Sequence, residues 1–135
     1  MKRIVFDASA LMTFFENRPG AEKVQDLIRL GIEGKHQLFL SVVNWGELYY
    51  STWRTKGPGV ARKNIEDIAQ LPILLVPADV ELARQAAEFK ANFHLPYADG
   101  FAAALALMRK ATLATSDKDF ASLEKKLNIL WTIGP

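Results

Sequence analysis

The chain has 135 residues and no cysteine, which excludes a disulfide framework, a thiolate zinc site and a cysteine nucleophile. Hydrophobic residues make up 50% and charged residues 24% of the sequence, a balance typical of soluble globular proteins. The formal net charge of +2 permits a nucleic-acid partner without indicating one. We expect a single domain, residues 1–135, because this length is enough to bury a core without metal or disulfide support.

The first residues imitate a secretory leader, because Lys2 and Arg3 precede an apolar segment. Asp7 interrupts that segment early, and residues 16–18 end it before any small-residue cleavage site. The longest later apolar run, residues 102–108, is far shorter than the roughly 20 residues of a membrane span. We therefore expect a cytoplasmic protein without a membrane segment.

The beginning of the chain predicts one strand and two helices. Residues 4–6 form an apolar run that stops at Asp7, which indicates a short buried strand ending at a carboxylate. Apolar residues at helical spacing predict a helix up to residue 15, which the Asn-Arg-Pro-Gly sequence at 17–20 ends. A second helix is expected over residues 24–32, with its apolar side chains on one face.

The next segment repeats the alternation of strand and helix. A second strand is expected over residues 38–40, and Ser41 is a favourable cap for a helix over residues 42–54. The spacing along that helix puts three residues on one side: Val43, Gly46 and Tyr50. Residues 55–59, Thr-Lys-Gly-Pro-Gly, predict a loop because glycine and proline favour turns.

The remaining elements complete an α/β pattern. Helices are predicted over residues 61–71, 79–89, 96–110 and 118–126, and strands over residues 73–76, 111–114 and 128–131. The buried side of the helix over 79–89 is expected to carry Val80, Leu82, Ala83, Ala86, Ala87 and Phe89. Short apolar strands separated by helices indicate a parallel sheet with right-handed crossovers. The predicted fold is one three-layer α/β/α domain with a five-stranded parallel sheet.

Four acidic residues stand at comparable positions near the predicted strand ends: Asp7, Glu47, Asp99 and Asp117. Asp7 and Asp117 directly follow strands, Glu47 lies in the first turns after the second strand, and Asp99 lies in the first turn of a helix. Each acid alone is also explained as a helix cap or as a complement to the helix dipole. If these elements enter the same edge of the sheet, the four side chains converge.

Convergence of these acids would require a compensating cation or strongly raised pKa values, because ionised carboxylates repel one another at neutral pH. Oxygen ligands without a neighbouring His or Cys indicate Mg²⁺ or Mn²⁺ rather than zinc. His36 and His94 stand alone without ligand spacing. A hard divalent cation can polarise a phosphoryl oxygen and activate water, which would suit phosphodiester hydrolysis.

The motifs around these acids resemble, in order, those of the PIN-domain ribonucleases, and among them the VapC-type toxins of toxin–antitoxin pairs. The matching segments are Val-Phe-Asp-Ala-Ser-Ala-Leu around Asp7, Glu47 after the second strand, Tyr-Ala-Asp-Gly-Phe-Ala-Ala-Ala around Asp99, and Thr-Ser-Asp-Lys-Asp-Phe around Asp117. The resemblance spans nearly the whole chain, although Trp45 is bulkier than the family pattern suggests. It implies a PIN-like sheet, Mg²⁺- or Mn²⁺-dependent cleavage of RNA, a homodimer, and inhibition by a small VapB-like antitoxin.

The resemblance also assigns roles to individual residues. Asp7, Glu47, Asp99 and Asp117 match the catalytic, metal-holding acids of the family, with Glu47 holding metal or orienting water. Asp119 matches a frequent fifth acid with a secondary role at the metal. Ser9 and Thr115 match small hydroxyl residues that are expected to hydrogen-bond the carboxylates or metal-bound water, and simple capping is the alternative.

Two further pairs of residues are candidates for contacts with partners. Arg18 and Lys118 are expected to guide RNA phosphates, with solvated surface as the alternative. Tyr49 and Trp53 belong to an aromatic group on the helix over 42–54, which suits either core packing or a partner interface such as an antitoxin helix.

Two other function classes remain open at this stage. In phosphatases of the haloacid dehalogenase type, an aspartate after the first strand attacks phosphate directly, but a second aspartate usually follows two residues later, where this chain has Ser9. A non-catalytic RNA-binding or regulatory module could keep the acids for a structural cation. Sequence spacing does not decide whether Glu47 and Asp99 reach the same ion.

Overall fold

The computed structural model describes residues 1–133. The strands are β1 (Lys2–Phe6), β2 (His36–Ser41), β3 (Ile73–Val76), β4 (Thr112–Thr115) and β5 (Ile129–Trp131). The helices are α1 (Ala8–Phe15), α2 (Ala21–Ile32), α3 (Val42–Lys56), α4 (Pro58–Ala69), α5 (Val80–Phe93), α6 (Tyr97–Arg109) and the 3₁₀ helix η1 (Lys118–Leu123). No helix within residues 1–133 has the length and apolar character needed to cross a membrane.

The five strands form one parallel sheet in the order β3-β2-β1-β4-β5. The chain builds outward from the central strand β1 in two directions, first to β2 and β3 and later to β4 and β5. The order therefore reverses between β1 and β4, and ligands of open parallel sheets bind at such a switch point beyond the carboxyl ends of the strands. The predicted five-stranded parallel sheet is confirmed.

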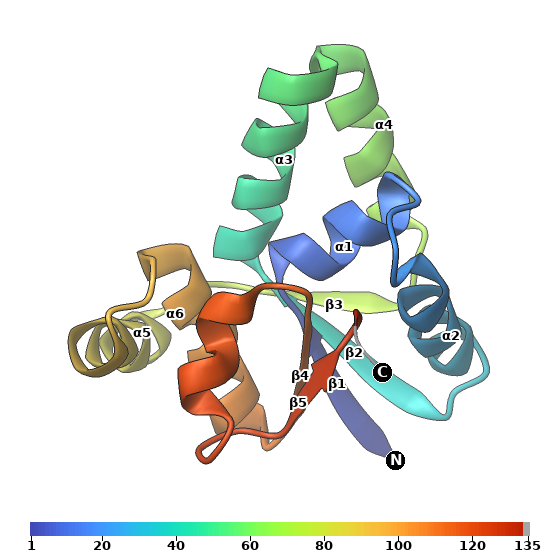
Figure 1. The fold of residues 1–135 in the computed structure, drawn as a ribbon. Helices are drawn as coiled ribbons and strands as arrows, with labels where there is room; N and C mark the ends of the chain where they lie inside the picture. The colour runs from blue at the N-terminus through green and yellow to red at the C-terminus, as the bar shows by residue number, and fades with distance from the viewer. Residues whose placement is uncertain (134–135) are drawn as a thin grey trace.

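Helices cover both faces of the sheet (Figure 1). The alternation of side chains along β1 sends Ile4 and Phe6 to one face and Val5 to the other, and none of the three is exposed. Ile4 and Phe6 pack with α1 and α2, whereas Val5 packs with α5 and α6. The apolar strands are buried on both sides, as expected for a parallel sheet between two helical layers.

Helices α3 and α4 form a hairpin that stands away from the sheet (Figure 1). The side chain of Ser41 caps α3 by accepting a hydrogen bond from the Val43 N–H over 3.2 Å, as the sequence predicts. The predicted loop over 55–59 is wrong, because Gly57 is the single residue between the two helices. Its φ of 93° turns the chain, and Pro58 suits the first position of α4.

The buried face of α5 differs from the prediction, and the buried face of α3 is largely polar. The buried residues of α3 are Asn44, Leu48 and Thr52, whereas Tyr50 is 55% exposed. In α5 the first residue, Val80, is 86% exposed and Ala87 is also exposed, because the helix packs through a single stripe of Leu82, Ala86 and Phe89. In α3 two of the three buried side chains are polar, so apolar spacing does not indicate this face.

The helix predicted over 118–126 is instead the shorter 3₁₀ helix η1. Asp117 caps it by accepting a hydrogen bond from the Asp119 N–H at 2.9 Å. This tight turn places Asp117 and Asp119 next to each other immediately after β4, at the edge of the sheet where β1 ends.

Candidate metal centre

Asp7 lies at the end of the central strand β1 and is only 2% exposed. Its carboxylate caps α1 by accepting a hydrogen bond from the Ala10 N–H over 2.9 Å. The Ser9 hydroxyl lies 2.8 and 2.9 Å from the two carboxylate oxygens, and the Thr115 hydroxyl donates to Oδ2 at 2.5 Å. Asp7 is therefore both a helix cap and a rigidly held acid at the switch point of the sheet.

The same two hydroxyl groups also fix the segment that follows β4. The Ser116 N–H donates to Ser9 Oγ over 3.1 Å, and the Asp117 N–H donates to Thr115 Oγ1 over 2.9 Å. Ser9 and Thr115 themselves lie 3.2 Å apart between their hydroxyl oxygens. Asp7 and Asp117 are thus joined through one short network that crosses from β1 to β4.

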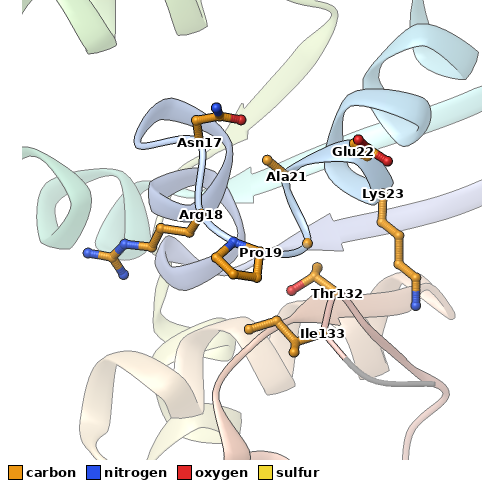
Figure 2. Close-up of a pocket in the computed structure, with 9 residues that line it drawn as sticks. Asn17, Arg18, Pro19, Ala21, Glu22, Lys23, Thr132 and Ile133 are labelled. Carbon is orange, nitrogen blue, oxygen red and sulfur yellow. The ribbon is translucent and has the colours of Figure 1, made fainter.

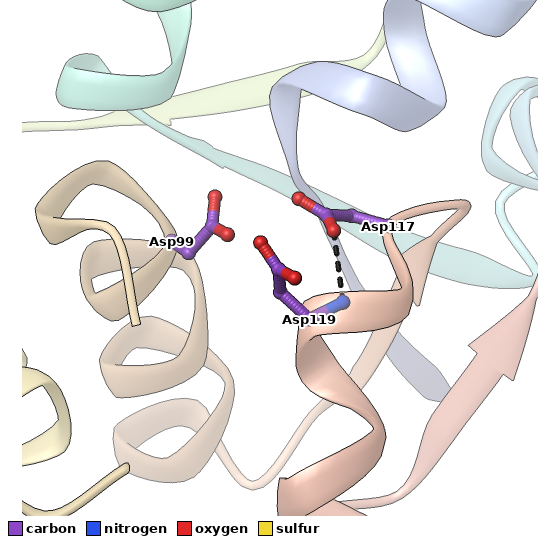
Figure 3. Close-up of side chains that lie close together, drawn as sticks. All are labelled: Asp99, Asp117 and Asp119. Carbon is purple, nitrogen blue, oxygen red and sulfur yellow. Dashed lines mark hydrogen bonds between the residues drawn. The ribbon is translucent and has the colours of Figure 1, made fainter. Parts of the chain in front are cut away.

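Three carboxylates form a tight group beside this network. One oxygen each from Asp99, Asp117 and Asp119 lies within 4.8 Å of the others. Figure 3 shows these side chains pointing toward one another, Asp99 from α6 and the other two from the start of η1. Asp119, which the sequence analysis places in a secondary role, belongs to this closest group.

Glu47 extends from α3 toward the same acids and is positioned by a neighbour on its own helix. The Asn44 amide donates to Glu47 Oε1 over 3.4 Å and to the Ala98 carbonyl over 3.0 Å, and Asn44 has no exposed surface. Asn44 therefore ties the helix of Glu47 to the first turn of α6, which carries Asp99. Asn44 is not among the predicted site residues, although its spacing of four residues from the buried Leu48 places both on one face.

The pKa values of three acids are raised, chiefly by burial. Burial raises the pKa of Asp99 to about 8, and the charge of Asp117 adds to the rise. Burial raises the pKa of Asp7 to about 6, although the hydrogen bonds from Thr115, Ala10 and Ser9 oppose the change. The pKa of Glu47 is also raised by burial, with Asn44 opposing and Asp117 adding to it.

The charge of Asp117 raises the pKa of Asp7, Glu47 and Asp99, so the four predicted acids share one electrostatic environment, although only Asp99 and Asp117 belong to the closest group. All donors in the group are carboxylate oxygens, the ligands that hard divalent cations prefer. Oδ2 of Asp99 is buried and has no hydrogen-bond partner among residues 1–133. A bound cation would satisfy this oxygen and offset the repulsion, so the residues fit a divalent metal ion.

The predicted RNA-contacting residues Arg18 and Lys118 belong to two different segments. Arg18 lies in the loop between α1 and α2, pairs with Glu16 at 2.9 Å, and lines a pocket of about 550 Å³. Figure 2 shows the side chains of Thr132 and Ile133 across this pocket from the loop. Lys118 is exposed and directly follows Asp117 in the chain.

Three aromatic residues of α3, Trp45, Tyr49 and Trp53, form a row along the helix. Tyr49 lies between Trp45 and Trp53, with ring centroids 5.7 Å from each. Trp53 is 41% exposed, and the Arg62 guanidinium of α4 lies 5.1 Å from the centre of its ring. This row is partly open to solvent, so core packing alone does not account for it.

Solved structures with the same fold come from bacterial toxin–antitoxin complexes. A chain of VapBC2 from Rickettsia felis bound to a promoter DNA fragment aligns with a TM-score of 0.76 and 13% identity, covering 95% of this chain and 97% of that chain. A chain of DNA-bound VapBC from Salmonella typhimurium gives a TM-score of 0.74 and 14% identity, with 98% and 100% coverage. At these identities the likeness concerns the fold.

Another similar structure is VapC20 from Mycobacterium tuberculosis, described as a toxin that cleaves the sarcin-ricin loop. It aligns with a TM-score of 0.71 and 16% identity, covering 88% of this chain and 93% of that chain. No sequence among curated proteins matches significantly. The model of the PIN domain matches residues 4–126, which include every acid of the cluster. The chain therefore belongs to the PIN-domain family.

Proposed function

We propose that this PIN-domain protein is a metal-dependent endoribonuclease, the toxin of a VapBC-type pair that inhibits translation in the cytoplasm. The observation that carries the proposal is the group formed by Asp99, Asp117 and Asp119, with Asp7 and Glu47 in its field, at the switch point of the sheet. The fold shared with chains of VapBC complexes and with a VapC toxin described as cleaving the sarcin-ricin loop supports the choice of substrate.

In this proposal Asp7, Asp99 and Asp117 hold Mg²⁺ or Mn²⁺, and Asp119 joins them as a ligand or an outer contact. When bound, the cation supplies positive charge to a phosphoryl oxygen and lowers the pKa of water. Glu47 either contributes an oxygen to the ion or orients the attacking water. Ser9 and Thr115 keep the Asp7 carboxylate in one orientation and favour its charged form.

RNA contacts are proposed for two basic residues, Lys118 and Arg18. Lys118 is adjacent to Asp117 and exposed, which suits a contact with a phosphate close to the cut. Arg18 lies at the pocket between α2 and the end of β5, and its ion pair with Glu16 is exposed enough to exchange for a phosphate.

An antitoxin of the VapB type is the proposed regulatory partner. The row formed by Trp45, Tyr49 and Trp53 on α3 offers a partly exposed aromatic surface against which an amphipathic segment could pack. Three of the structural neighbours are described as VapBC or toxin–antitoxin complexes, which supports a protein partner of this class.

A homodimer is proposed from a different surface. Edge strand β3 exposes 54% of Leu74 and 41% of Leu75, and Val80 at the start of α5 is 86% exposed. Apolar side chains concentrated at a sheet edge are a liability unless another surface covers them. Measurement of the molar mass in solution by light scattering tests this proposal: a dimer is expected, and a stable monomer would contradict it.

The experiment that tests the nuclease function is incubation of total RNA with the purified chain, freed of any co-purified partner, in Mn²⁺, in Mg²⁺ and in chelator. We expect discrete cuts only with metal, and no 2′,3′-cyclic phosphate ends, because the attacking group is water rather than the RNA 2′-hydroxyl. Binding of RNA without cleavage in either metal would support the non-catalytic module instead. The phosphatase alternative is disfavoured by PIN-domain membership and by Ser9, and a trapped aspartyl-phosphate at Asp7 would revive it.

A further inference from the structure

A separate cavity of about 410 Å³ lies on the β5 side of the acid group. Its walls are Ser116, Lys118, Ala121, Trp131 and Ile133. Ser116 and Lys118 stand on either side of Asp117 in the chain, so the segment that carries Asp117 also forms one wall of the cavity. None of the proposed metal ligands lines this cavity.

The aromatic wall of this cavity is anchored to the same strands that hold the acids. Trp131 pairs with Thr115 in the β4–β5 register, and the Thr132 N–H donates to the Thr115 carbonyl over 3.0 Å. The Trp131 carbonyl also accepts a hydrogen bond from Lys23 Nζ at 3.2 Å. Part of the indole packs on the core and the rest remains accessible, so it offers a fixed flat surface beside the cluster.

The composition of the walls suits one nucleotide. Trp131, Ala121 and the 52% exposed Ile133 form an apolar surface, and Lys118 provides a positive charge that makes no ion pair within the part of the chain described. Aromatic side chains stack on the bases of single-stranded RNA, and lysine contacts the phosphates between them. Ile133 also borders the pocket of Arg18, so a second basic residue lies farther along the same side.

We propose that this cavity receives the base of the nucleotide next to the cleaved phosphate, with the base stacked on Trp131 and its phosphate contacted by Lys118. The inference rests on the proposed function and adds the position at which a base is recognised. Stacking alone accepts any base, so the cavity contributes affinity for unpaired RNA and fixes which phosphate lies at the acids.

The test is the dissociation constant for a short fluorescein-labelled oligoadenylate, measured by fluorescence anisotropy in an Asp7→Asn background that prevents cleavage. Trp131→Ala is expected to weaken binding about tenfold, as loss of one stacked base does. Trp131→Phe should retain most of the affinity, and Lys118→Ala should weaken binding and lower its salt dependence. Tyr50→Ala, at an exposed aromatic residue on α3, is the matched control and should bind as the parent does.

A second variant guards against misfolding of Trp131→Ala, since Trp131 also packs on the core. Ala121 is exposed, so Ala121→Phe can fill the cavity from its rim without disturbing buried residues, and it should also bind about tenfold more weakly. An abasic oligonucleotide of the same length should bind weakly, and substitution of Trp131 should leave its affinity unchanged. Unchanged oligoadenylate binding by both cavity variants, or no binding by the parent, would overturn the inference.

Separate measurements of oligoadenylate binding and of RNA cleavage distinguish failure of this inference from failure of the nuclease proposal. A protein that binds oligoadenylate through Trp131 but cuts no RNA in Mn²⁺ would refute the nuclease and keep the base site. A nuclease whose binding is insensitive to Trp131→Ala and Ala121→Phe would refute the base site alone. If these variants weaken an antitoxin complex and not RNA binding, the cavity is a protein contact and the inference fails.

Discussion

The Thr115 hydroxyl donates a hydrogen bond to Oδ2 of Asp7 across 2.5 Å and thereby joins the ends of β4 and β1. Asp7 is almost wholly buried, and burial disfavours its charged form. The bond from Thr115 opposes that effect and is the largest of the influences that lower the Asp7 pKa. One hydroxyl group therefore holds a proposed metal ligand in place and adjusts its charge.

Replacement of Thr115 by valine should remove this bond while keeping the volume of the side chain. We expect a loss of about 1–2 kcal/mol in the free energy of unfolding and a further rise of the Asp7 pKa above its value of about 6. The pH at which Mn²⁺ binds should rise as well, because metal binding requires the carboxylate form. Denaturant unfolding and metal titrations at several pH values measure both effects. Thr115→Ser keeps the hydroxyl and is the control, and a Thr115→Val protein that matches it would contradict the assigned role.

The metal-free protein should become less stable as the pH rises. The folded-state pKa values of Asp99, about 8, and Asp7, about 6, exceed their ordinary value of 3.8. Between about pH 4 and pH 8 the folded state binds more protons than the unfolded state, so the free energy of unfolding falls with increasing pH. Thermal unfolding in chelator across this window tests the sign. A melting temperature that rises steadily through it would contradict the prediction.

Removal of one charge from the group should have the opposite effect on the metal-free protein. Asp99→Asn keeps the shape of a buried side chain whose Oδ2 has no partner among residues 1–133, and it removes the repulsion from Asp117. We expect a gain of at least about 1 kcal/mol in stability at pH 8, since one pKa unit corresponds to about 1.4 kcal/mol. Added Mn²⁺ should stabilise the parent protein but not this variant. Equal stabilisation of both by Mn²⁺ would remove Asp99 from the ligand set.

Asn44 should affect catalysis through Glu47 rather than by touching substrate. Asn44→Ala removes the amide that contacts Glu47 Oε1 and the Ala98 carbonyl, which leaves Glu47 less fixed and α3 less firmly attached to α6. We expect a loss of about 1–3 kcal/mol in stability, because a buried polar group loses its partner. We also expect the rate of RNA cleavage at saturating substrate to fall with little change in KM. A variant with reduced stability but an unchanged rate would limit Asn44 to a structural role.

The sheet and the position of each acid relative to the strands and helices are predictable from the sequence because they depend on local patterns. The apolar runs at β1 and β2 stop at the edge of the sheet, and the residues that follow, Asp7 and Ser41, favour helix caps in any context. A parallel sheet then requires that the first residues after each strand share one edge. This geometry brings Asp7 and Asp117 to one edge, whereas Asp99 follows the helix α5 and reaches that edge only through the packing of α6.

The relative placement of the acids was not predictable, because it depends on how elements pack. Asp119 joins the closest group only because η1 is a tight 3₁₀ turn, whereas an α-helix was expected there. Asn44 was missed because buried polar residues carry no apolar signal. The cavity beside Trp131 is lined only by residues between 116 and 133, but it depends on how η1 packs beside β5, which residue spacing does not indicate.

The most direct test of the account is cleavage of a labelled single-stranded RNA by the parent protein and by Asp7→Asn, side by side, in Mn²⁺. Asp7→Asn keeps the size of the side chain and an oxygen that can cap α1, so circular dichroism should show an intact fold. The account predicts cleavage by the parent that chelator abolishes, and no cleavage by the variant. A folded Asp7→Asn protein that cuts RNA as the parent does would contradict the central claim that these acids form the catalytic metal centre.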